Sequence, residues 1–108
     1  MRKSYIVSAK RTAIGSFLGG LATVKPKDTG SEVVKALLAD ANVAPENVDE
    51  VICGNVLGAG LGQNIGRTIA LEAGIPETVC AHSVNMVCGS GLRTVMEAVM
   101  SIQCGFND

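Results

Sequence analysis

The hydrophobic and polar positions of this chain change period several times, and each change predicts a new element of secondary structure. Short apolar runs at residues 5–8, 51–53 and 79–85 predict three β-strands. Segments with an apolar residue every three or four positions predict three helices, at residues 29–41, 64–73 and 89–103. Strands alternating with helices predict an α/β fold in which at least some neighbouring strands are parallel.

The first predicted helix has side chains typical of helix caps at both ends. Thr29 and Glu32 have the spacing of a capping box, which predicts that Thr29 caps the amino end. Asn42 can close the carboxyl end in the left-handed conformation, and Pro45 prevents the helix from continuing.

The last predicted helix is apolar around most of its circumference. Its narrow polar stripe consists of Arg93, Glu97 and Ser101. A helix of this kind is normally packed on two sides. Three strands offer too little structure to cover both sides, so we expect the chain to be a part of something larger.

Composition and charge narrow the possible classes of protein. The 108 residues are 47% hydrophobic and 18% charged, with a formal net charge of −1. The hydrophobic fraction is ordinary for a globular protein and the charged fraction is low. Together they exclude a disordered chain, and the net charge offers no excess of positive charge for binding nucleic acid. We expect neither a membrane span nor a signal peptide, because no apolar stretch is long enough for either. A cytoplasmic protein with reduced cysteines is the resulting prediction.

Five glycines between Gly54 and Gly66 suggest a nucleotide-binding loop, but their spacing excludes it. A P-loop requires Gly-x-x-x-x-Gly-Lys-Ser/Thr and a dinucleotide fold requires Gly-x-Gly-x-x-Gly. Neither spacing is present in this segment. We therefore predict a tightly turned loop that passes close to another backbone segment.

Cys88 stands between the last predicted strand and the last predicted helix, and Gly89 and Gly91 follow it. A sharp turn there lifts the side chain clear of the sheet, and the free N–H groups at a helix start favour a thiolate and an oxyanion. The α/β hydrolases present their nucleophile in this way, although Met86 replaces the glycine of their pattern. A buried structural thiol is the alternative interpretation. A papain-like signature is broken at Gly91 and Leu92.

The remaining cysteines and the single histidine carry weaker signals. Cys53, Cys80 and Cys104 are predicted to be small buried hydrophobic residues. No Cys-x-x-Cys pair is present, so we expect no metal site. His82 is predicted to be a packing residue rather than a general base, because strand alternation does not direct it toward Cys88.

Several segments, in order along nearly the whole chain, match the motifs of one enzyme family. Residues 11–17 read Arg-Thr-Ala-Ile-Gly-Ser-Phe, similar to an Arg-Thr-Pro-Ile-Gly opening with Ala13 in place of proline. Residues 54–57 and 62–67 read Gly-Asn-Val-Leu and Gly-Gln-Asn-Ile-Gly-Arg, similar to Gly-Asn-Val and Gly-Gln-Asn-Pro-Ala-Arg segments. Residues 84–92 contain the nucleophile signature Asn-x-x-Cys-x-Ser-Gly. Together these segments resemble the thiolase family and, within it, the biosynthetic acetyl-CoA acetyltransferases.

The resemblance implies a fold of stacked helix, sheet, helix, sheet and helix layers made by two similar halves. Residues 1–108 would form the N-terminal part of the first half, without the loop domain or the C-terminal half. The glycine-rich loop, with Gln63, Asn64 and Arg67, would lie near a subunit interface and the catalytic pocket. Family members are homodimers or homotetramers.

The resemblance also implies a mechanism, in which Cys88 takes an acetyl group from acetyl-CoA and passes it to the carbanion of a second acetyl-CoA. The products are acetoacetyl-CoA and CoA, and the reaction is reversible. The N–H of Cys88 would contribute to an oxyanion hole. Asn85, Gly89, Ser90 and Gly91 would position the nucleophile. No cofactor or metal is implied beyond the coenzyme A of the substrate.

A longer family chain also supplies an activating histidine, a second cysteine and an asparagine-bearing segment. We therefore expect the 108 residues alone to be inactive, and marginally stable or self-associating because a strand edge and a helix face stay uncovered. Two alternatives remain open. One is a degradative thiolase for longer chains or a related condensing enzyme, and the other is a non-catalytic interaction module.

Overall fold

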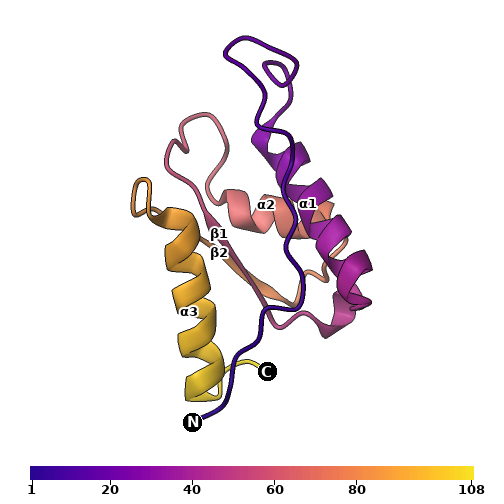
Figure 1. Ribbon diagram of the computed structural model, residues 1–108, viewed down its shortest axis with the longest axis vertical. Helices are drawn as coiled ribbons and strands as arrows, with labels where there is room; N and C mark the ends of the chain where they lie inside the picture. The colour runs from indigo at the N-terminus through magenta and orange to yellow at the C-terminus, as the bar shows by residue number, and fades with distance from the viewer.

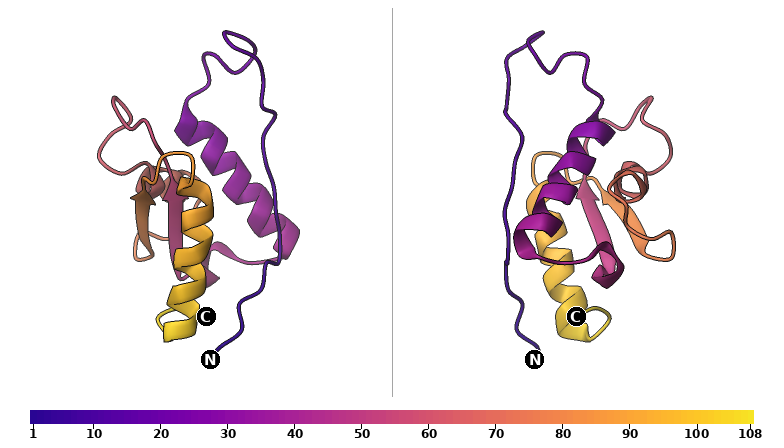
Figure 2. Two further views of the ribbon diagram at one scale, coloured as in Figure 1. Left: turned by 60° about the vertical axis from the view of Figure 1, so that its left-hand side comes forward. Right: turned by 90° about the vertical axis from the view of Figure 1, so that its right-hand side faces the viewer.

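The computed structural model describes residues 1–108 and contains a parallel two-stranded sheet between helices (Figure 1). The sheet lies between α3 on one side and α2, backed by α1, on the other (Figure 2). This arrangement confirms the predicted α/β class. In chain order the elements are α1 (Pro26–Ala41), the short 3-10 helix η1 (Pro45–Asn47), β1 (Glu50–Gly54), α2 (Ile65–Glu72), β2 (Cys80–Val84) and α3 (Ser90–Cys104).

The register of the sheet brings the carboxyl ends of both strands together. Glu50 pairs with Cys80 at one end, and Gly54 pairs with Val84 at the other. The backbone N–H of Asn55 extends the ladder by donating to the Val84 carbonyl at 3.0 Å. The glycine-rich loop that leaves β1 and the turn that leaves β2 therefore begin side by side.

The hydrophobic core is small and lies where α2 packs on the sheet. Val51, Ala70 and Ile75 are buried together, and Val34 and Leu38 of α1 pack against them. By contrast, α3 leaves much apolar surface uncovered, as the all-round apolar sequence predicts. Its exposed apolar side chains are Leu92, Val95, Met96 and Met100. None of the three α-helices is long and apolar enough to cross a membrane.

The predicted strand at residues 5–8 is wrong. The segment runs beside the molecule without strand structure or any backbone hydrogen bond, and Ile6 is 81% exposed. It is held by side chains instead, because Asp40 of α1 accepts a hydrogen bond from Ser8 at 2.6 Å and forms an ion pair with Lys10 at 2.9 Å. An apolar run forms a strand only where a sheet edge pairs with it, and here it pairs with neither strand.

The predicted amino end of the first helix is also wrong, by one turn. The helix begins at Pro26 with Lys25 at the cap position, and the Thr29 hydroxyl donates to the Pro26 carbonyl at 2.9 Å instead of capping. Proline has a φ angle already suited to the first helical position, so it starts the helix earlier. The carboxyl end is as predicted, because Asn42 adopts the left-handed conformation (φ 52°, ψ 43°).

The other two helices and two strands occupy the predicted segments within a residue or two at each end. Asn64 caps α2 by accepting a hydrogen bond from the Arg67 N–H at 3.2 Å. Gly105 closes α3 in the left-handed conformation with a φ of 79°. These ends follow local rules of capping, which explains why the sequence predicts them.

Candidate active site

A tight turn from Asn85 to Gly89 joins β2 to α3 and carries Cys88. Its central residue, Val87, has a φ of 49°, in the left-handed region. A β-branched residue is rare there, and such strain costs about 1–3 kcal/mol. Nothing in the sequence marks Val87, because glycine or asparagine is the expected residue at a left-handed position.

Side chains on both sides of the turn hold it in this conformation. The Asn85 side-chain oxygen accepts from the Val87 N–H at 3.0 Å. The Ser90 hydroxyl accepts from the Met86 N–H at 2.9 Å and donates to the Val87 carbonyl at 2.6 Å. Ser90 is buried, so these bonds are shielded from water. Asn85 and Ser90, both singled out by the resemblance, therefore fix the backbone of the two residues just before Cys88.

Cys88 itself is exposed and has a free thiol. Its backbone N–H and that of Gly91 donate to no carbonyl of the chain. A Cβ added at Gly91 would meet nothing within 4 Å, so the space beside the start of α3 is open. A molecule that approaches Cys88 thus meets free N–H groups and the positive end of a helix.

The glycine-rich loop begins next to this turn and is attached to it. The Asn85 side-chain amide donates to the Val56 carbonyl at 3.1 Å, so Asn85 binds the loop and the Cys88 turn at the same time. Between the loop and the end of β2 lies an open cavity of about 280 Å³. Its lining includes Gln63, Asn64 and Asn85.

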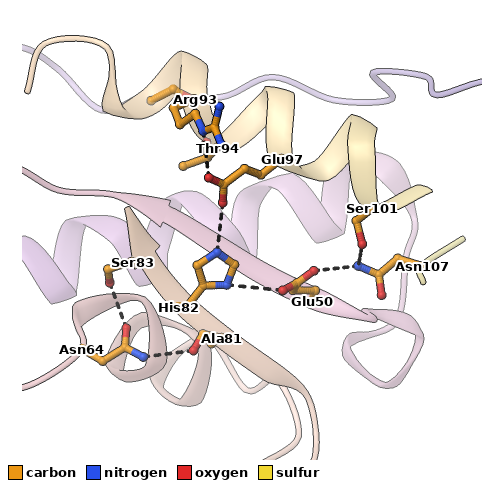
Figure 3. A network of polar contacts seen from close by, with 11 residues as sticks. Glu50, Asn64, Ala81, His82, Ser83, Arg93, Thr94, Glu97, Ser101 and Asn107 are labelled. Atoms are coloured by element: carbon orange, nitrogen blue, oxygen red, sulfur yellow. Dashed lines mark hydrogen bonds and ion pairs between the residues drawn. The ribbon is translucent and has the colours of Figure 1, made fainter. Parts of the chain in front are cut away.

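Asn64 and Arg67, predicted to belong to a pocket or interface loop, bind the backbone of β2 and the segment before it. Asn64 accepts from the Ser83 hydroxyl at 2.8 Å and donates to the Ala81 carbonyl at 3.0 Å (Figure 3). The Arg67 guanidinium donates to the carbonyls of Val79 at 2.7 Å and Glu77 at 2.6 Å. These carbonyls precede β2, whereas Cys88 follows it, so the structure does not bring the Arg67 side chain to the turn.

The predicted close approach of the glycine-rich segment to other backbone is confirmed at its two ends. A Cβ added at Gly54 would lie 2.7 Å from the Ser90 carbonyl carbon, and one at Gly66 would lie 2.5 Å from the His82 carbonyl oxygen. Hence Gly54 lets the start of α3 rest on the end of β1. Within the loop, by contrast, Gly60 has open space around it and a φ of 75°.

His82 does not lie beside Cys88 but points from β2 toward α3, between two carboxylates (Figure 3). Its Nδ1 is 3.3 Å from Glu50, and its Nε2 is 3.1 Å from Glu97. Arg93 donates to the second oxygen of Glu97 at 2.8 Å. This network ties β1, β2 and α3 together, which supports the interpretation of His82 as a structural residue.

We predict that Glu97→Gln lowers the melting temperature at pH 7 and that the difference narrows as the pH falls below 4.5. The hydrogen bond from His82, and then that from Arg93, lowers the pKa of Glu97 below its ordinary value of 4.5. A lowered pKa adds stability that is complete above pH 4.5 and is lost as the pH falls through the folded value. Melting curves from pH 7 to pH 3, with the exposed and unpaired Glu46→Gln as control, check this. A difference that persists at low pH would contradict it.

The prediction that the other three cysteines are buried is wrong for Cys80 and Cys104. Both are exposed, and both lie at the end of an element, Cys80 at the start of β2 and Cys104 at the end of α3. Cys53 is half-buried beside the core, and burial raises the pKa of its thiol. No three potential ligands from His, Cys, Asp or Glu come together as a metal site.

The fold and the turn define an α/β protein that presents a cysteine at the amino end of a helix packed on a parallel sheet. The family model of the thiolase N-terminal domain matches residues 4–108. The chain therefore belongs to the thiolase family, as the resemblance of its motifs implies.

Relatives and a solved structure agree with this assignment. The chain is 53% identical over 105 residues to the acetyl-CoA acetyltransferase of Escherichia coli, covering 97% of this chain and 27% of the relative. It is 55% identical over 100 residues to the cytosolic acetyl-CoA acetyltransferase of Mus musculus, covering 93% and 25%. The Acat5 thiolase of Ascaris suum in complex with coenzyme A matches with a TM-score of 0.93 and 37% identity, over 95% of this chain and 27% of that one. The chain thus spans about a quarter of the length of these proteins.

Proposed function

We propose that this chain supplies the nucleophile of an acetyl-CoA acetyltransferase, which condenses two molecules of acetyl-CoA reversibly to acetoacetyl-CoA and CoA. The observation that carries the proposal is the exposed Cys88 at the start of α3, on a turn held by Asn85 and Ser90. Relatives at about half identity are named acetyl-CoA acetyltransferases, which favours acetyl over longer acyl substrates. The acetyl group would be carried as a thioester on Cys88.

In the first step the Cys88 thiolate attacks the carbonyl carbon of acetyl-CoA, and the carbon–sulfur bond to coenzyme A breaks. The departing CoA thiolate takes up a proton. In the second step an α-proton leaves another acetyl-CoA, and the resulting carbanion attacks the acetyl carbon and releases Cys88. Both steps form an oxyanion, which the free N–H of Cys88 at the start of α3 can stabilise.

The neighbouring residues of the turn have distinct parts in this proposal. Asn85 and Ser90 keep the backbone of the turn fixed, so that the N–H of Cys88 is aimed before the substrate arrives. Gly91 leaves the approach to the helix start unobstructed, whereas Gly89 lets the turn close against Met86, whose terminal methyl carbon would lie 2.8 Å from a Cβ added there. Gln63 and Asn64, which line the cavity beside Asn85, belong to the surroundings of the pocket.

The proton transfers require groups that these residues do not supply beside Cys88. The single histidine of the chain is engaged with Glu50 and Glu97 on the face of the sheet. We therefore propose that the 108 residues alone have no turnover, and that a full-length homodimeric or homotetrameric enzyme in the cytoplasm uses them. The partner molecules would be acetyl-CoA and acetoacetyl-CoA, without a resident cofactor.

We predict that the chain restores activity when joined to the remainder of a relative. In the experiment, residues 1–108 replace the matching quarter of the Escherichia coli acetyl-CoA acetyltransferase, and cleavage of acetoacetyl-CoA by CoA is followed. The expected chimera is active, whereas the 108-residue chain alone is not, because catalysis needs both nucleophile and base. The unmodified Escherichia coli enzyme is the control. A folded, oligomeric but inactive chimera, or turnover by the chain alone, would contradict the proposal.

A further inference from the structure

The left-handed conformation of Val87 is hard to explain from the backbone alone. Glycine or asparagine would adopt a φ of 49° with little strain, and the same turn already contains glycine at position 89. A β-branched side chain in this region is an outlier, and an outlier at a reacting centre points to a use for that side chain.

The Val87 side chain is not needed for packing within the chain. The Val87 side chain is 63% exposed, and Met86 beside it is 54% exposed. The hydrogen bonds that hold the turn come from the backbone N–H and carbonyl of Val87, which any residue possesses. The isopropyl group therefore contributes little to the folded chain, although its position is fixed.

We propose that Val87 is a specificity-determining residue, whose isopropyl group forms an apolar contact for the acyl end of the thioester that reacts at Cys88. Consecutive Cα atoms are only about 3.8 Å apart, so an apolar chain attached to the Cys88 sulfur can lie against the neighbouring isopropyl. The inference rests on the proposed role of Cys88 and adds a substrate contact to it.

Two alkylating probes of matched chemistry test this contact on the 108-residue chain without requiring turnover. Iodoacetamide reports the reactivity of the Cys88 thiol, and N-hexyl iodoacetamide adds an apolar chain. The measured quantity is the rate of labelling of Cys88 by N-hexyl iodoacetamide divided by its rate of labelling by iodoacetamide, obtained by peptide mapping. The ratio at the exposed Cys80 in the same molecule is the internal reference.

We expect Val87→Gly to reduce the Cys88 ratio by about fourfold, the factor that one contacted methylene contributes. Val87→Ile should keep the ratio of the unchanged chain. Leu18→Gly, which relieves another left-handed exposed residue (φ 55°) in the loop before α1, should also leave it unchanged.

A Val87→Gly variant in which both probes slow in proportion would overturn the inference, since that result means altered positioning of Cys88 and not a lost contact. A Val87→Gly variant in which neither rate changes would overturn it as well. The proposed function is tested by a separate measurement, and it fails if the chimera carries no acetyl group on Cys88 after incubation with acetyl-CoA. The two failures are therefore distinguishable.

Discussion

Replacing Cys88 with alanine should lower the rate of acetoacetyl-CoA cleavage in the active chimera by about four orders of magnitude or more, the usual loss when a covalent nucleophile is removed. The physical reason is that no neighbouring group can take its place. Cys80 is the first residue of β2 and pairs with Glu50, at the opposite end of the strand from the Cys88 turn. Cys53 is half-buried, and burial raises the pKa of its thiol. Without the thiol no acetyl intermediate can form on this turn, although the free backbone N–H groups at the start of α3 remain.

Intact mass and peptide mapping after incubation with acetyl-CoA alone check the same prediction independently. The unchanged chimera should gain one acetyl group, located on Cys88, and the Cys88→Ala variant should gain none. Cys80→Ala is the matched control, because it removes an exposed cysteine at the other end of β2 and should retain full activity. An acetyl group located on Cys80, or a Cys88→Ala variant with near-normal turnover, would remove Cys88 from the mechanism.

The position of Cys88 could be predicted because each signal around it is local. An apolar run ends at Val84, glycine follows the cysteine, and helical periodicity starts directly afterwards. Capping at Asn42 and Gly105 is local in the same sense, since a left-handed residue closes a helix without help from distant parts of the chain. Local rules therefore predicted the Cys88 turn and the carboxyl ends of α1 and α3 correctly.

Two features that depend on distant contacts were predicted wrongly. Residues 5–8 have the composition of a strand, but pairing requires a sheet edge that only the folded chain can offer or withhold. Burial of Cys80 and Cys104 likewise depends on what covers β2 and the end of α3. Cysteine is buried in most proteins, and that general preference was misleading here.

The residues that hold the Cys88 turn could likewise be predicted only in part. Asn85 and Ser90 were singled out by resemblance, but their hydrogen bonds to the Val87 backbone follow only from the coordinates. The strain at Val87 has no signal in sequence, because it arises from the way neighbouring side chains close the turn. Nor does the sequence reveal that Asn85 also binds the glycine-rich loop at Val56.

Gly54→Ala should be strongly destabilising, with a loss of about 3 kcal/mol of unfolding free energy, the upper end of the usual range for overpacking. The added Cβ would lie 2.7 Å from the Ser90 carbonyl carbon and 2.8 Å from the Gly91 nitrogen. Both are backbone atoms of α3, so no flexible side chain can move aside. Strand and helix must separate instead, and this shifts Ser90 away from the Val87 and Met86 groups that it binds.

Thermal unfolding of the 108-residue chain measures the first effect, with an expected decrease in melting temperature of more than about 10 °C. Gly20→Ala and Gly91→Ala are matched controls, because an added Cβ meets nothing within 4 Å at either position and neither has a left-handed φ. Iodoacetamide labelling measures the second effect, a changed rate at Cys88 with an unchanged rate at Cys80. A Gly54→Ala variant with the same melting temperature as the controls would show that β1 and α3 are not in contact at Gly54. The inference that this contact holds Ser90 in place beside the Cys88 turn would then be wrong.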